Sequence, residues 1–305
     1  MITYKRLLSL AVVIMSLALS SCQKNEPDLS GEAHLTGPGA SEKLRILTTI
    51  APLYSFTGNI AGDAADVENL LPSGAGPHDF SLSPMDARRI LNAHVLVING
   101  VSLEAWLDNV IDSAPAHGAD GGKLIVVDTS RGVEIVNKDP HIWLSPRNAM
   151  IQVRNIRDAM IKTDPRNGEI YAANAAAYTV RLISLDREIR EEIKTWKNKE
   201  FVAFHSAFGY FAREYGLRQA AVIQETPETE PSPRHIASVI ETIKSKGIKS
   251  IFTEIQASHK IVSSLAADLG LKVYSLDTLE KGSPGIGWYE ERMRANLAAL
   301  REALQ

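Results

Sequence analysis

The sequence predicts an α/β protein of two lobes, each with a mainly parallel sheet flanked by helices, joined by one long backbone helix. From Leu44 onward, short β-branched runs alternate with helical patterns, which is typical of βαβ units and parallel sheets. One uninterrupted helical pattern divides this alternation into two comparable halves. The chain of 305 residues is also longer than a single hydrophobic core usually supports. Together these observations favour two lobes over one domain.

Residues 1–21 are predicted to be an export signal. Lys5 and Arg6 precede the apolar run Leu7–Leu19, which is too short to span a bilayer. Cys22 follows directly, so this junction resembles a bacterial lipobox, in which the cysteine carries a lipid. We therefore expect a cleaved signal peptide, a flexible tether over residues 22–43, and a mature protein anchored by lipid on the extracytoplasmic or periplasmic side of a membrane.

Composition excludes several function classes. Cys22 is the only cysteine, so a metal site within one chain must use His, Asp or Glu. The formal net charge is −3 and becomes more negative once the leader is removed, whereas nucleic-acid proteins usually carry a basic excess. We expect no nucleic-acid partner and a monomer.

The N-terminal lobe is predicted over residues 44–164. Its strands are placed where β-branched and apolar residues cluster, and its helices where apolar residues recur at helical spacing. The expected strands are Leu44–Thr49, Val67–Leu71, Val95–Asn99 and Leu124–Asp128; the expected helices are Leu53–Ala61, Pro84–Ala93 and Leu103–Ser113, with another opening near Pro146.

The linking helix is predicted over residues 165–197. After Pro165 no proline interrupts this segment, and apolar residues from Tyr171 to Ile193 recur every three or four positions. Such a helix would be about 50 Å long, enough to run along two lobes. A rigid helical connection predicts only a small closing motion when a ligand binds.

The C-terminal lobe is predicted over residues 198–305, where the same alternation resumes. Ser232 followed by Pro233 is a favourable start for one of its helices. The expected strands are Phe201–His205, Ala220–Gln224, Ser250–Glu254 and Lys272–Leu276; the expected helices are Ala207–Tyr215, Pro233–Lys246, Lys260–Leu269 and Gly287–Ala303.

Three histidines and one aspartate lie at or beyond the ends of predicted strands. They are His78 and His141 in the first half, and His205 and Asp277 in the second. Ligand sites of parallel sheets gather beyond the carboxyl ends of the strands. The four side chains are therefore candidates for facing rims of a site between the lobes.

Three imidazoles and one carboxylate suit Zn²⁺, which is commonly held by four nitrogen and oxygen ligands, better than Mg²⁺ or Ca²⁺. Imidazole must be neutral to bind a metal, so affinity should fall as the pH drops through about 6.5. The spacing of these residues matches no local metal motif. Read from spacing alone, a structural role for each histidine stays open.

Several stretches resemble the metal-binding lipoproteins of ABC uptake systems for zinc and manganese, known as solute-binding protein family 9. The resemblance extends from about Leu44 to Leu304. Its most specific stretches are Asp139–Leu144, His205–Phe211, Glu230–Arg234 and Phe252–Glu254.

The resemblance implies two α/β lobes joined by a backbone helix, one metal between them, and an ABC permease and its ATPase as partners. The family's ligand positions fall on His78, His141, His205 and Asp277. Zinc-type members are similar to this chain in carrying histidine at the third position, where manganese-type members carry glutamate. We therefore expect Zn²⁺ as cargo, with Mn²⁺ possible, and Zn²⁺ also ranks higher in intrinsic affinity.

The sequence departs from the family pattern in several places, which leaves affinity and selectivity open. Zinc-type members often carry a loop rich in histidine and acid, whereas Ala114–Lys138 has His117 as its only histidine. The family also usually has aspartate where this chain has Gly76, Ser145 and Ser206, and proline where it has Ile255 and Thr278.

Two alternatives remain beside a zinc receptor. An extracytoplasmic zinc hydrolase could use the three histidines, with Asp277 or Glu254 as the base. A catalytic zinc needs an open coordination position, which a fourth ligand fills, and the chain has no His-Glu-x-x-His motif. We therefore expect no enzyme. A manganese-type receptor or an adhesin on the same scaffold is the other alternative.

Overall fold

The computed structural model describes residues 43–112, 123–224, 230–255 and 260–305. The predicted signal peptide, Cys22 and the tether up to residue 42 lie outside the described residues. Within the described ranges, no helix is both long enough and apolar enough to cross a membrane.

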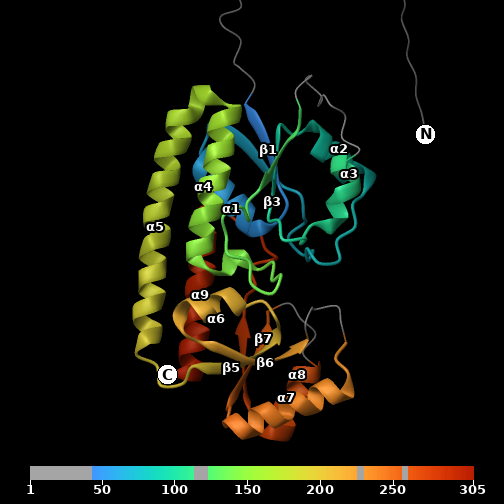
Figure 1. Cartoon of the computed structure of the whole chain (residues 1–305), viewed down its shortest axis with the longest axis vertical. Helices are drawn as coiled ribbons and strands as arrows, with labels where there is room; N and C mark the ends of the chain where they lie inside the picture. Colours follow the sequence, from blue (N-terminus) through green and yellow to red (C-terminus); the bar gives the residue numbers. More distant parts are fainter. Residues whose placement is uncertain (1–42, 113–122, 225–229, 256–259) are drawn as a thin grey trace, which may run out of the picture. The chain divides into compact units, whose positions relative to one another are not determined.

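The first half is a four-stranded parallel sheet with the strand order β2-β1-β3-β4. Helices follow the strands as predicted (Figure 1). The strands are β1 (Leu44–Thr48), β2 (Ala65–Asn69), β3 (Val95–Ile98) and β4 (Ile125–Asp128). The helical elements are α1 (Ala51–Ala61), α2 (Pro84–Asn92), η1 (Ala105–Leu107), α3 (Asp108–Asp112), η2 (Ile142–Leu144) and α4 (Pro146–Thr163).

The starts of α2 and α4 follow from local sequence. The Ser83 hydroxyl accepts the backbone N–H of Asp86, and the Asp86 carboxylate accepts the N–H of Ser83, which forms a capping box. Ser145 caps α4 through the N–H of Asn148. Proline occupies the first position of both helices, where its missing N–H costs nothing.

The second half repeats the architecture with the strand order β6-β5-β7-β8, again all parallel. This confirms the predicted fold class. The strands are β5 (Glu200–His205), β6 (Arg218–Gln224), β7 (Ser250–Glu254) and β8 (Lys272–Leu276). The helices are α6 (Gly209–Tyr215), α7 (Pro233–Lys246), α8 (Lys260–Leu269) and α9 (Trp288–Leu304).

The long helix α5 (Gly168–Lys194) connects the halves, after a short 3-10 turn η3 (Pro165–Asn167). It packs against α1 and α4 of the first half and against α6 and α9 near its other end (Figure 1). Its fully buried side chains are those of the predicted apolar series: Tyr171, Ala175, Tyr178, Leu182, Leu185, Ile189 and Ile193.

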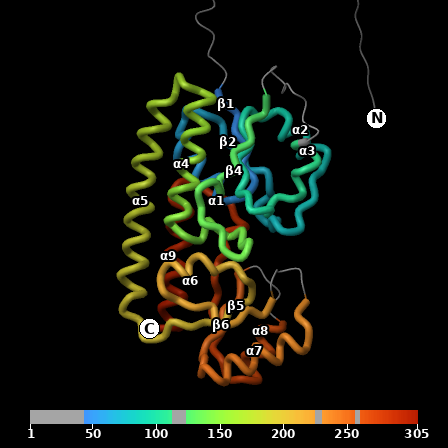
Figure 2. The backbone as a smooth tube through the Cα atoms, in the orientation of Figure 1, coloured from blue at the N-terminus to red at the C-terminus, as the bar shows by residue number. Residues whose placement is uncertain are grey.

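The inner faces of the two sheets belong to one continuous hydrophobic core. It includes Ile46 and Val97 from the first sheet and Phe201 and Phe252 from the second. The C-terminal helix α9 contributes to it and contacts both α1 and α5 (Figure 2). Because neighbouring residues of a strand face opposite sides, the outer faces form separate clusters, in which Leu47 and Val202 take part. The lobe boundaries at residues 164 and 198 remain a prediction.

Candidate metal centre

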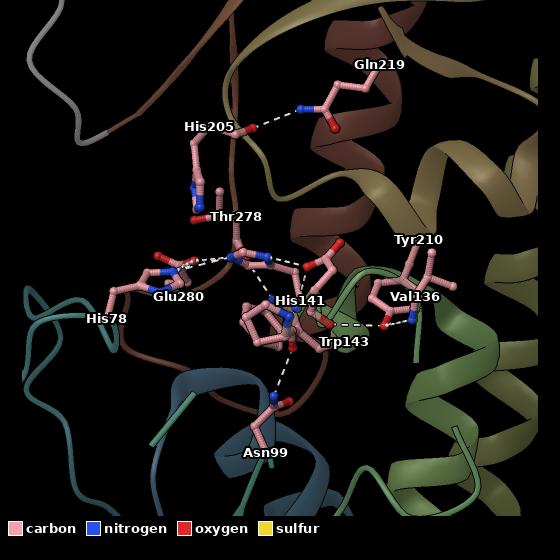
Figure 3. Close-up of polar contacts among 12 residues, drawn as sticks. His78, Asn99, Val136, His141, Trp143, His205, Tyr210, Gln219, Thr278 and Glu280 are labelled. Carbon is pink, nitrogen blue, oxygen red and sulfur yellow. Dashed lines mark hydrogen bonds and ion pairs between the residues drawn. The ribbon is translucent and has the colours of Figure 1, made fainter. Parts of the chain in front are cut away.

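Four buried or half-buried side chains converge where the two halves meet. His78 lies in the loop after β2, and His141 lies immediately before η2. His205 ends β5, and Glu280 lies in the loop after β8. Each side chain offers one potential ligand atom, and these four atoms all lie within 4.8 Å of one another. They form a possible metal-binding group among the described residues. Figure 3 shows the four side chains pointing toward one another.

The spacing of the ligand atoms fits a small four-coordinate ion. Nε2 of His78 lies 3.3 Å from Nε2 of His141, and each of these nitrogens lies 3.1 Å from Oε1 of Glu280. Tetrahedral ligands at zinc distances are about 3.4 Å apart. Nε2 of His205 is buried and has no hydrogen-bond partner among the described residues. A buried imidazole nitrogen without a partner fits a metal ligand.

Two carboxylates fix the orientation of two of the imidazoles. Nδ1 of His141 donates to Oδ1 of Asp139 at 2.6 Å, and Nδ1 of His205 donates to Oε1 of Glu254 at 3.0 Å. Each bond places the ring proton on Nδ1, which leaves the lone pair of Nε2 free for a metal. Glu254 ends β7, the strand beside β5, so the sheet itself sets the second of these distances.

The loop before His141 is itself anchored. Oδ1 of Asp139 also accepts the backbone N–H of His141 at 2.9 Å. The side chain of Asn99, at the end of β3, donates to the carbonyl oxygen of Pro140 at 2.8 Å (Figure 3). These contacts tie the imidazole to the first sheet.

The charges of the site strongly perturb two groups. Burial alone would lower the pKa of His141, but hydrogen bonds and charge from Asp139 and Glu280 outweigh it and raise that pKa to about 9. Burial would raise the pKa of Glu280, yet hydrogen bonds from His141 and His78 and their charge hold it well below its usual range. Without metal, the carboxylate is therefore charged and His141 retains a proton at neutral pH.

The structure brings Glu280, rather than the expected Asp277, to the three histidines. Oδ1 of Asp277 accepts the backbone N–H of Leu279 at 2.8 Å, and its Oδ2 lies 3.6 Å from Nη1 of Arg292. Burial, with the charges of Glu254 and Glu280, raises the pKa of Asp277. Its carboxylate is thus engaged in the turn and by a neighbouring cation.

The conformation of this turn explains why the sequence analysis missed Glu280. Leu279 has a φ of 60°, a left-handed conformation rare for a branched side chain, so the chain turns sharply between the two acids. The only sign of it in the sequence was that a second acidic residue, Glu280, comes three positions after Asp277. Neither periodicity nor spacing indicates which acid such a turn directs toward the histidines.

A cavity of about 930 Å³ reaches the site at Glu280 and has residues of both halves in its walls. Glu280 lines it, whereas the three histidines do not. An ion entering from this cavity would therefore meet Glu280 first. The acidic residues of its lining are Asp79, Glu230, Glu254, Asp277 and Glu280, and the basic ones are Lys260 and Lys281.

Comparison with known proteins identifies the family of this chain. Residues 46–303 match the family described as zinc-uptake complex component A, periplasmic. The high-affinity zinc uptake system protein ZnuA of Bacillus subtilis is 34% identical over 287 residues, covering 86% of this chain and 88% of that protein. The zinc-binding protein AdcA of Streptococcus pyogenes is 35% identical over 289 residues, covering 86% of this chain but only 56% of AdcA.

A solved structure shares both fold and sequence. The Zn(II)-bound ZnuA-like domain of Streptococcus pneumoniae AdcA superposes with a TM-score of 0.73 at 34% identity, covering 86% of this chain and 98% of that domain. The family match over residues 46–303 includes both sheets and the helix between them. The chain therefore belongs to the family of periplasmic zinc-uptake components.

Proposed function

We propose that this chain is the extracytoplasmic receptor of an ABC importer, which captures Zn²⁺ between its two halves and delivers it to a membrane permease. The observation that carries the proposal is the convergence of His78, His141, His205 and Glu280 within 4.8 Å. Family membership supports the same conclusion, because relatives are named for zinc uptake and zinc binding.

The donor set favours zinc as cargo. Three imidazole nitrogens and one carboxylate oxygen provide the mixed nitrogen and oxygen ligands that Zn²⁺ prefers. Glu280 contributes one negative charge directly, and Asp139 and Glu254 add two more behind the imidazoles. These charges offset the cost of burying a divalent ion.

The same donor set supports binding over hydrolysis. A catalytic zinc keeps one position open for water, whereas Glu280 supplies a fourth ligand here. Lipid anchoring through Cys22 and the use of a permease with its ATPase belong to the same proposal. They rest on the predicted lipobox and on the family.

The first experiment is metal analysis of the protein purified without chelator, followed by competition of Zn²⁺ against Mn²⁺ on metal-stripped protein. We expect one Zn²⁺ per chain and displacement of Mn²⁺ by Zn²⁺. Failure to bind a divalent ion would refute the receptor function, and a preference for Mn²⁺ would refute zinc as cargo. Turnover of an ester or peptide panel by the zinc-loaded protein would support the hydrolase instead.

A further inference from the structure

Gly209, the first residue of α6, contacts Asp139 across the boundary between the halves. A Cβ atom placed on Gly209 would lie 2.8 Å from Oδ2 of Asp139, which is shorter than the distances that Cβ atoms keep from other atoms in proteins. The backbone of Gly209 is not in the left-handed region, so alanine could adopt its conformation. The glycine is therefore required here by the nearby carboxylate and not by its own φ angle.

Tyr210, the next residue, restrains the same loop. Its hydroxyl donates to the carbonyl oxygen of Asp139 at 3.0 Å and accepts the backbone N–H of Val136 at 3.1 Å (Figure 3). The ring is buried, in a small apolar cluster with Val133 and Ile142. Because the loop is held at its backbone, it cannot easily shift as a whole away from an added methyl group at Gly209, so the Asp139 carboxylate itself would have to turn aside.

We propose that Gly209 is a positioning residue of the metal centre, which acts through Asp139. The missing side chain leaves room for Asp139 to hold Nδ1 of His141, and this bond aims Nε2 of His141 at the ion. The inference rests on the proposed function and extends it. Metal affinity then depends on a contact made by the half of the molecule that does not contain His141.

The test is Gly209→Ala, measured by competitive zinc titration. The added Cβ displaces the Asp139 carboxylate, so the Kd for Zn²⁺ should rise about 10- to 100-fold, the range found when partners of metal-binding histidines are lost. Gly58→Ala is the matched control, because a Cβ in this helical position meets nothing within 4 Å. The control should keep the wild-type Kd.

A double-mutant cycle separates positioning from general damage. Asp139→Ala alone should raise the Kd by a comparable factor. Gly209→Ala added to Asp139→Ala should raise it no further, because the carboxylate that the methyl group displaces is gone. Additive effects would overturn the inference. The visible spectrum of bound Co²⁺ should change in the same way in both single variants, and an unchanged Gly209→Ala spectrum would also overturn it.

Tyr210→Phe offers a second test should Gly209→Ala fold poorly. It removes the hydroxyl that restrains the Asp139 loop but keeps the buried ring, and it should raise the Kd by a smaller factor; an unchanged Kd would count against the inference. A wild-type protein that binds no zinc would instead refute the proposed function. Zinc binding that is equal in wild type and a folded Gly209→Ala variant would refute only the positioning role.

Discussion

The three imidazoles of the site are held in different ways. Carboxylates accept from Nδ1 of His141 and of His205, whereas no described residue forms such a bond with Nδ1 of His78. The first two rings are also buried more deeply than the third. Preorganised ligands lose little freedom when metal binds, so the affinity of the site should depend strongly on Asp139 and Glu254.

Two substitutions at Glu254 separate its hydrogen bond from its charge. Glu254→Gln keeps an oxygen that accepts from Nδ1 of His205, whereas Glu254→Ala leaves this buried donor without a partner. We expect Glu254→Ala to raise the Kd for Zn²⁺ about 10- to 100-fold and Glu254→Gln to raise it much less. Competitive titration measures both values. Equal losses would mean that the hydrogen bond does not matter.

The choice between Glu280 and Asp277 as the fourth ligand can be tested directly. Glu280→Ala should raise the Kd for Zn²⁺ by more than about 100-fold, beyond the effect of losing an outer partner. Asp277→Ala should change it by less than about 10-fold, since its carboxylate bonds to Leu279 and faces Arg292. The reverse order would identify Asp277 as the ligand.

The raised pKa of His141 makes zinc binding depend on pH above neutrality. Because that pKa is about 9 without metal, zinc must displace a proton from His141 below this pH. Asp139, Glu280 and His78 face the ring, and the two carboxylates retain the proton. The apparent affinity for Zn²⁺ should therefore rise roughly tenfold per pH unit from pH 7 to about 9 and then level off. An unperturbed imidazole would give this levelling at about pH 6.5 instead.

The stability of the metal-free protein changes with pH in the opposite direction to its zinc affinity. A folded-state pKa above the unfolded value of 6.5 stabilises the metal-free fold below pH 6.5, and this contribution is lost as the pH rises through about 9.

Titration at several pH values, with the protons released per zinc measured by calorimetry in two buffers, checks the affinity prediction. An affinity that does not change between pH 7 and 9 would contradict it.

At the scale of elements, α5 matters most because both halves pack against it. Its buried residues form one stripe along its whole length, and the opposite face is open to solvent. This periodicity is why the sequence predicted the helix well, including the positions that face the core. The structure differs only at the ends, where Pro165 begins a 3-10 turn and the helix stops at Lys194.

Two substitutions on α5 compare its faces. Leu185 is fully buried in the shared core, so Leu185→Ala should lower the free energy of unfolding by about 2 to 5 kcal/mol. Val180 is 66% exposed on the same helix, so Val180→Ala should change it by less than about 0.5 kcal/mol. Urea unfolding of the metal-free protein measures both. Similar effects would show that the core does not depend on this stripe.

Other element boundaries show where sequence patterns fail. The second strand was predicted at Val67–Leu71 but is β2, Ala65–Asn69, because Leu70 and Leu71 are buried in the turn after it. An apolar pair identifies burial but not the end of a strand. The helix predicted at Leu103–Ser113 is a 3-10 turn followed by the short α3; it comes after Val101 and Ser102, both with positive φ.

At the scale of the molecule, three of the four side chains could be predicted from topology together with the family resemblance. His78, His141 and His205 were expected together because parallel strands end at one edge of each sheet, and the structure brings them together. The fourth side chain could not be predicted from the strand ends, because Glu280 reaches the histidines through the left-handed turn at Leu279. A burial pattern places a strand approximately, whereas the direction of a side chain in a loop depends on backbone angles that no sequence pattern records.

The connections between the halves predict how far the molecule moves when zinc binds. Nε1 of Trp143 donates to the carbonyl oxygen of Thr278 at 2.8 Å, and the hydroxyl of Tyr289 donates to the carbonyl oxygen of Trp143 at 2.7 Å. Both bonds are buried, and breaking such bonds without replacement costs about 1 to 3 kcal/mol each. With the shared core and α5, they oppose a large rotation of one half against the other.

Zinc should therefore rearrange loops and not rotate the halves. The segments best able to move are the loops that carry His78 and Glu280, because they border the cavity, whereas His205 ends a central strand. X-ray scattering of metal-stripped and zinc-loaded protein should give the same radius of gyration within error. Hydrogen exchange should slow mainly in these two loops. A scattering change that requires a hinge rotation between the sheets would contradict this prediction.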